Sequence, residues 1–173
     1  MQLNKMIAER MPGRAASDSG TGQELRQRFI ARDMAVRTAL QDLRRWLLAR
    51  GLQPDLIGRT ELALAEILNN IAEHGYHPDL PGWIALRCRL GRRGVLFAVM
   101  DSGRRMPDEL LQPPTGAMPV HCQPDIDALP EGGFGWFLIH RLTRDMTCQR
   151  DRTGNRLTFR VPHREADSGP MPG

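Results

Sequence analysis

The spacing of apolar residues changes along this chain, from the period of helices to the period of strands. Between Asp33 and His74 apolar residues recur every three or four positions, in two segments separated by Gly51 and Pro54. From Ile84 to about residue 90 they occupy every second position, as in a half-buried strand. We therefore expect two consecutive helices, the first capped by Asp33 and the second ending at Gly75, followed by strands. The expected core positions are Val36, Ala39, Leu40, Leu43, Trp46 and Leu47 in the first helix, and Ile57, Leu64, Leu68 and Ile71 in the second.

The remaining segments complete a two-layer architecture. A short extended stretch is expected at 25–30. The run 95–100 is apolar on both faces, which predicts a central strand with elements packed on either side. A helix should follow the glycines of 132–135 and end near Leu142, and a turn at 151–155 should join two final strands. This order predicts a two-layer α/β sandwich of the α+β class with a mostly antiparallel mixed sheet, rather than a doubly wound parallel fold.

The 173 residues divide into one domain and two tails. Residues 1–22 and 163–173 are polar and lack periodicity, so we expect flexible tails on either side of a domain at 23–162. Six prolines fall within 107–130, where periodicity is almost absent. A long irregular segment inside a domain is typical of a functional lid, which we place at about 104–131.

Composition excludes several classes of chemistry. Of the 24 cationic residues 23 are arginine, and the one lysine, Lys5, lies in the expected N-terminal tail. A Walker A loop and the strand lysine of eukaryotic-type protein kinases are therefore excluded, as is Schiff-base catalysis. The arginines are scattered among 20 acidic residues with only 9 aromatic residues, which disfavours direct nucleic-acid binding.

No apolar run approaches the roughly 18 residues of a membrane span. Three cysteines without a C-x-x-C pair suit a reducing compartment, so we expect a cytoplasmic protein.

A polar stripe runs along the second expected helix. Glu66, Asn69, Asn70 and Glu73 are spaced i, i+3, i+4 and i+7, which places them on one face. Asparagine is a poor helix former, so two adjacent asparagines suggest a ligand or a buried partner. The stripe is either a solvated face or a site at which a glutamate acts as a general base beside an oxygen ligand for Mg²⁺.

Two glycine-containing motifs follow this helix. Asp101-Ser102-Gly103 comes directly after an apolar strand, as a turn or as a carboxylate beside a close backbone approach. Glu131-Gly132-Gly133-Phe134-Gly135 precedes a helix, where backbone N–H groups can bind an anion such as phosphate. Its spacing and position do not match a dinucleotide-binding fingerprint.

Other candidate residues are weaker. His74 and His77 lack a third metal ligand nearby, which favours capping and packing roles for both histidines. Ser102 has no evident histidine partner, so a nucleophilic serine is disfavoured.

Taken in chain order, these segments resemble the GHKL ATPase superfamily, and within it the anti-sigma factor serine kinases. The run from Glu61 to Tyr76, closing in His-Gly-Tyr, is similar to the N box of that branch. Asp101-Ser-Gly103 resembles the first glycine box and Gly132-Gly-Phe-Gly135 the second. The proline-rich segment falls where the family has its ATP lid. The resemblance covers about 23–162 and implies a Bergerat-type ATP-binding fold.

The resemblance also implies roles for single residues. Glu66 would be the catalytic base, and Asn70 would bind Mg²⁺ that bridges the ATP phosphates. Asp101 would accept a hydrogen bond from the adenine amino group, and Gly103 would let the base approach. Phosphates would lie at the helix start. The residues that it implies for nucleotide binding are Asn69, Asn70, Glu73, Asp101, Gly103, Arg105, Gly132, Gly133, Phe134 and Gly135.

The implied function is that of an ATP- and Mg²⁺-dependent serine/threonine protein kinase and anti-sigma factor. It would phosphorylate a STAS-type anti-anti-sigma protein, bind a sigma factor and form a homodimer. Many GHKL members have a second glycine in the first box, where this chain has Arg105. That departure leaves an alternative open, a regulatory module that binds ATP and protein partners without transferring phosphate.

Overall fold

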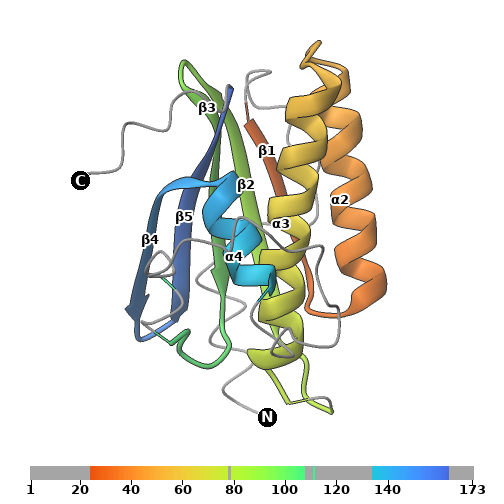
Figure 1. Cartoon of the computed structure of the whole chain (residues 1–173). Helices are drawn as coiled ribbons and strands as arrows, with labels where there is room; N and C mark the ends of the chain where they lie inside the picture. The colour runs from red at the N-terminus through yellow and green to blue at the C-terminus, as the bar shows by residue number, and fades with distance from the viewer. Residues whose placement is uncertain (1–23, 78, 108–110, 112–133, 164–173) are drawn as a thin grey trace, which may run out of the picture.

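The structure, a computed structural model, describes residues 24–77, 79–107, 111 and 134–163. Within them five strands form one sheet in the order β1-β2-β3-β5-β4, and the helices lie together in front of it (Figure 1). The elements are β1 (Glu24–Ile30), α2 (Asp33–Leu48), α3 (Pro54–His74), β2 (Trp83–Gly91), β3 (Gly94–Asp101), α4 (Phe134–Leu142), β4 (Arg144–Asp151) and β5 (Gly154–Pro162). The predicted two-layer α+β fold and its element order are confirmed.

Each of the four strand pairings is antiparallel, so the sheet is not mixed as expected. The connection through α4 makes β4 run in the same direction as β3. However, β5 turns back from β4 and inserts between the two, pairing antiparallel with both. The chain therefore has a crossover connection between two strands of the same direction, but these two strands are not neighbours in the sheet.

The helices pack as their apolar periodicity predicts. The expected α3 positions Ile57, Leu64, Leu68 and Ile71 are all at most 4% exposed. On α2 the buried residues are Val36, Ala39, Leu43 and Leu47, while Leu40 and Trp46 pack at the edge of the core. Asp33 is not the N-cap: Arg32 has the extended cap conformation, and Asp33 is the first helical residue. The Asp33 carboxylate can instead interact with the positive end of the helix dipole.

β3 is the central strand, as predicted, but only one of its faces is covered by helices among the described residues (Figure 1). Val95, Phe97 and Val99 are buried on that face, whereas the alternate residues Leu96, Ala98 and Met100 are half-buried. Within the described residues, the expected packing of elements on both faces is therefore not found. In register beside the half-buried residues lie Arg87, Arg89, Arg156 and Arg160 of the flanking strands. Long arginine stems can cover apolar surface while their charged ends reach water.

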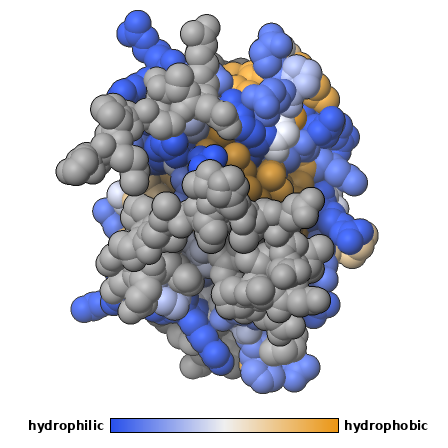
Figure 2. All heavy atoms as spheres, viewed as in Figure 1, coloured by the Kyte–Doolittle hydropathy of each residue, from blue (hydrophilic) through white to orange (hydrophobic). Residues whose placement is uncertain are grey.

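Where Figure 2 colours the surface, hydrophilic residues predominate and hydrophobic residues show in the upper centre of the view. Among the described helices none combines the length and the apolar character that crossing a bilayer requires.

Candidate functional site

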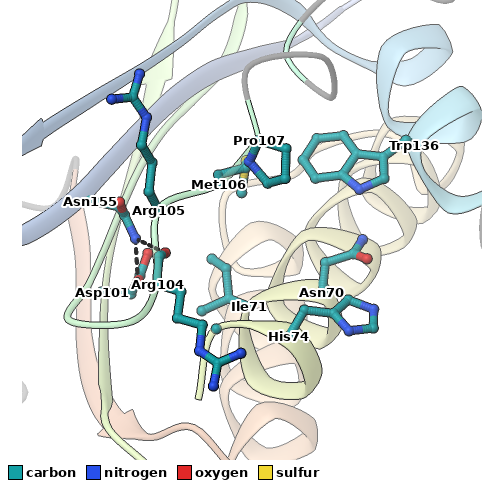
Figure 3. A pocket seen from close by; sticks show the side chains of 11 residues that line it. Asn70, Ile71, His74, Asp101, Arg104, Arg105, Met106, Pro107, Trp136 and Asn155 are labelled. Carbon is teal, nitrogen blue, oxygen red and sulfur yellow. Dashed lines mark hydrogen bonds between the residues drawn. The ribbon is translucent and has the colours of Figure 1, made fainter. Parts of the chain in front are cut away.

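A cavity lies where the C-terminal half of α3 faces the end of β3, with α4 beside it (Figure 3). It is lined by Asn70, Ile71, His74, Gly75, Asp101, Arg104, Arg105, Met106, Pro107, Trp136 and Asn155. Polar groups come from α3, the end of β3 and the start of β5, while Ile71, Met106 and Trp136 supply apolar walls. An apolar cleft with a few convergent polar groups is the usual form of a small-molecule site.

Asp101 is a buried carboxylate at the end of β3 and only 3% exposed. Its Oδ1 accepts hydrogen bonds from the Gly103 N–H at 2.8 Å and from Asn155 Nδ2 at 2.9 Å. Burial raises the pKa of Asp101, and these two hydrogen bonds, together with the charge of Arg150, partly oppose the rise. Among the described residues no group hydrogen-bonds to Oδ2, so this oxygen remains available to a donor on a ligand.

Glu66 and Asn70 lie one turn apart on α3 and meet the second residue of α4. Asn70 Nδ2 donates to the backbone oxygen of Glu66 at 2.7 Å, which leaves Asn70 Oδ1 without a partner among the described residues. A Cβ placed on Gly135 would lie 2.6 Å from Glu66 Oε2 and 3.9 Å from Asn70 Nδ2. Only glycine at this position lets the backbone of α4 approach the Glu66 carboxylate so closely.

The Glu66 carboxylate has no hydrogen bond or ion pair within the described part of the chain. A glutamate without such a partner, beside the start of a helix, can accept a proton from a bound hydroxyl group. Asn70 offers one oxygen to a cation. No cluster of three or more His, Cys, Asp or Glu side chains is found among the described residues. The single Asn70 oxygen is compatible with Mg²⁺, which is usually held by one or two protein groups together with substrate phosphates and water.

The other candidates from the sequence divide into three groups. Gly103 and Arg105 lie at the root of the expected lid: Gly103 is buried and donates to Asp101, and Arg105 lines the cavity. The exposed residues Asn69 and Glu73 are on α3 but do not line the cavity. The third group is the second glycine box: Gly132 and Gly133 lie outside the described residues, as do 112–131 of the expected lid, and Phe134 is described only as the start of α4.

Sequence reasoning missed three side chains of this region. Asn155 bonds to Asp101, and Arg150 of β4 donates to Asn155 Oδ1 at 2.7 Å. His74, which we expected to cap and pack, lines the cavity one turn beyond Asn70. The i+4 spacing from Asn70 could have indicated His74. Asn155 and Arg150 border a hairpin turn, where Asn and Gly are expected for conformational reasons alone.

Tyr76 holds together the chain segments that border Asp101. Its hydroxyl donates to the backbone oxygen of Trp83 at 2.8 Å and accepts from the Ser102 N–H at 2.9 Å. Burial raises the pKa of Tyr76. The Ser102 hydroxyl also lies 3.4 Å from the Tyr76 hydroxyl. The closing His-Gly-Tyr of the α3 segment thus joins the end of α3 to β2 and to the residue after Asp101.

A family model described as histidine kinase-like ATPase domain matches residues 29–161. The serine-protein kinase RsbW of Oceanobacillus iheyensis is 28% identical over 96 residues, covering 56% of this chain and 60% of that protein. The serine/threonine-protein kinase BtrW of Bordetella bronchiseptica is 32% identical over 99 residues, covering 57% and 65%. RsbW of Bacillus cereus is 29% identical over 115 residues, covering 66% and 70%. The match thus spans less than two thirds of the first two relatives.

A solved structure has a similar fold. It contains the RsbU and RsbW domains of Rv1364c from Mycobacterium tuberculosis and superposes with a TM-score of 0.54 at 21% identity. The superposition covers 80% of this chain and 32% of that one. At this identity the likeness concerns the fold, which agrees with the antiparallel sheet and helices described above.

Proposed function

The chain belongs to the histidine kinase-like ATPase domain family, and on that premise we propose that it is an ATP-dependent serine/threonine protein kinase and anti-sigma factor. Its substrate would be a STAS-type anti-anti-sigma protein in a bacterial partner-switching system. The observation that carries the proposal is the Glu66 carboxylate, which has no partner among the described residues and lies beside Asn70 and the backbone of Gly135. Relatives named as serine or serine/threonine kinases support the same activity.

The nucleotide is expected to enter the cavity with its base toward Asp101. Asp101 Oδ2 would accept a hydrogen bond from the adenine amino group, and Ile71 and Met106, which line the cavity, would contact the base. The phosphates extend toward the start of α4, where Gly132, Gly133 and the backbone of Gly135 would hold them. Bound Mg²⁺-ATP supplies the transferable phosphoryl group and a cation that neutralises phosphate charge.

Glu66 accepts the proton from the hydroxyl group of the substrate serine or threonine. General-base assistance of this kind contributes about 10²–10⁴-fold in rate. Asn70 Oδ1 offers an oxygen to Mg²⁺, and its amide is held in that orientation by the bond from Nδ2 to the Glu66 backbone. The described residues around the cavity include no lysine, and the proposed chemistry does not need one, because a metal ion and backbone donors would supply the positive charge.

The test is phosphoryl transfer from labelled ATP to a purified STAS-type protein. Glu66→Gln should reduce transfer by at least about a hundredfold while leaving ATP binding intact. Glu61→Gln is the matched control, because Glu61 lies on the same helix but pairs with Arg44 outside the cavity. Asn70→Ala should weaken nucleotide binding only when Mg²⁺ is present. Equal transfer by the Glu66→Gln and native proteins would refute the assigned role.

Arg105 motivates a second candidate, a module that binds ATP and protein partners without phosphoryl transfer. Arg105 lines the cavity at the position where many family members have a glycine. In that case the native chain binds ATP and changes its affinity for a sigma factor, but no label reaches any STAS-type protein. A homodimer belongs to the main proposal, and sedimentation of the purified chain measures it directly.

A further inference from the structure

Asn155 connects the cavity to the outer strand of the sheet. Asp101 and Asn155 are partners in the register of β3 and β5, although 54 residues separate them. Asn155 is 6% exposed, and its Nδ2 donates both to Asp101 Oδ1 at 2.9 Å and to the backbone oxygen of Arg104 at 2.8 Å. Both hydrogens of the amide group are thus used on acceptors at the root of the expected lid.

Arg150 determines which way this amide points. Its Nη1 donates to Asn155 Oδ1 at 2.7 Å and to the backbone oxygen of Gly103 at 3.0 Å. A guanidinium group has only donors, so the Asn155 oxygen must face Arg150 and the Asn155 nitrogen must face Asp101. If the amide turned over, its oxygen would face a carboxylate oxygen, and that contact would favour a protonated Asp101.

The state of Asp101 matters because the two purine bases offer opposite groups at the same ring position. Adenine presents an amino donor, whereas guanine presents a carbonyl acceptor. An ionised Asp101 with Oδ2 in the cavity can only accept, and it therefore selects the amino group. A protonated Asp101 could also donate to a carbonyl. Discrimination between the bases thus depends on keeping this buried carboxylate ionised and its Oδ1 occupied.

We propose that Arg150, acting through the Asn155 amide, is the positioning residue that makes the cavity select adenine over guanine nucleotides. Arg150 does not touch the base; it orients Asn155, which in turn holds Asp101. The inference rests on the proposed nucleotide site and adds to it a residue from the outer strand β4. Arg150 lies outside both the first glycine box and the polar stripe of α3, the motifs that the sequence analysis identified.

Several other charged or titratable groups surround Asp101, and they stay the same when Arg150 is changed. His74 of α3 and Tyr76 just after it lie on one side, and Arg104 and Arg105 follow β3 on the other. Burial remains the largest influence on the pKa of Asp101, and it acts upward. Removing the Arg150 charge and the fixed amide therefore moves protonation of Asp101 toward neutral pH.

The experiment compares ATP and GTP affinities by calorimetric titration over a pH series. Arg150→Met removes the donors at an exposed position, and we expect the ratio of ATP to GTP affinity to fall about tenfold, or about 1.4 kcal/mol. The pH at which ATP binding is half lost should rise in the same variant. Arg150→Lys, whose ammonium group can donate to both oxygens, should restore the native ratio. Arg152→Met is the control, since Arg152 is exposed and has no hydrogen bond or ion pair among the described residues.

Each possible result of these titrations either supports or overturns the proposed role of Arg150. A native ratio and a native pH midpoint in Arg150→Met overturn it, as does an equal loss of ATP and GTP affinity, because either result reduces Arg150 to a structural contact. Absence of nucleotide binding by the native chain overturns both this inference and the proposed function. Selective binding that depends on Arg150, without phosphoryl transfer by the native chain, supports the inference and refutes only the kinase activity.

Discussion

Replacing Gly135 by alanine should separate the stability of this protein from its activity. The new Cβ would lie 2.6 Å from Glu66 Oε2, whereas ordinary van der Waals contacts begin at 3.4 Å. The nearest group is the end of a flexible side chain, so the Glu66 carboxylate can move away by about 0.8 Å without displacing any backbone. The perturbation therefore acts on the position of the proposed base and hardly on the fold.

The two contributions to stability nearly cancel. Glycine in a helix is less stable than alanine by about 0.5–1 kcal/mol, which the substitution recovers. A glutamate forced away from its preferred rotamer costs about 0.5–1.5 kcal/mol. The free energy of unfolding should therefore change by less than about 1 kcal/mol. A displacement approaching 1 Å in a reacting group lowers the rate about a hundredfold, so phosphoryl transfer should fall by that factor.

Urea denaturation measures the first quantity, and transfer of labelled phosphate to a STAS-type protein measures the second. Gly58→Ala is the matched control, because a Cβ on this exposed glycine of α3 would meet nothing within 4 Å. That variant should gain about 0.5–1 kcal/mol and transfer phosphate at the native rate. Native transfer by Gly135→Ala would refute the close approach of α4 to Glu66. Destabilisation by several kcal/mol would show that backbone, rather than the Glu66 side chain, occupies the space.

Two further predictions concern groups around Asp101. Tyr76 is the only tyrosine of the chain, so the absorbance of its phenolate reports its titration alone, and burial should place its pKa above 10.0. Because this folded-state pKa is raised, the stability contributed by the neutral phenol is fully present below pH 10 and is lost as the pH rises through the folded value. A midpoint at or below 10 would contradict its burial. Gly154→Ala should destabilise the fold by at least about 2 kcal/mol in urea, since Gly154 has φ of +145° and its Cβ would lie 1.9 Å from the Asp101 backbone oxygen. Near-native stability would show that the hairpin can move away from β3.

The helices and the order of the elements follow from local patterns. In α3 the apolar stripe faces the sheet and the Glu66–Asn70 pair lies beside it, because a period of 3.6 residues determines both faces at once. A local pattern could not tell whether Asn69 and Glu73 belong to the same site. Both are on the polar side of the helix, but the cavity reaches only the side shared by Asn70 and His74.

Sequence patterns did not predict the contacts between residues that lie far apart in the chain. The apolar run of β3 predicted cover on both faces, yet the described structure has arginines of β2 and β5 beside one of them, and strand register brings those residues there. The same register pairs Asp101 with Asn155. Neither neighbour can be read from the residues of β3 themselves, because pairing depends on how the whole sheet is assembled.

Local sequence patterns are enough to predict the class of fold, the helix that presents Glu66 and Asn70, and the place of Asp101 at a strand end. Hydrophobic period and turn chemistry act over a few neighbouring residues. Two features follow only from the folded chain: α4 approaches Glu66 at Gly135, and Arg150 orients Asn155, which donates to Asp101 Oδ1. The reason is physical: hydrogen bonds and close contacts depend on distances of a few ångströms, and those between segments far apart in the chain are set by the packing of the sheet and helices as one body.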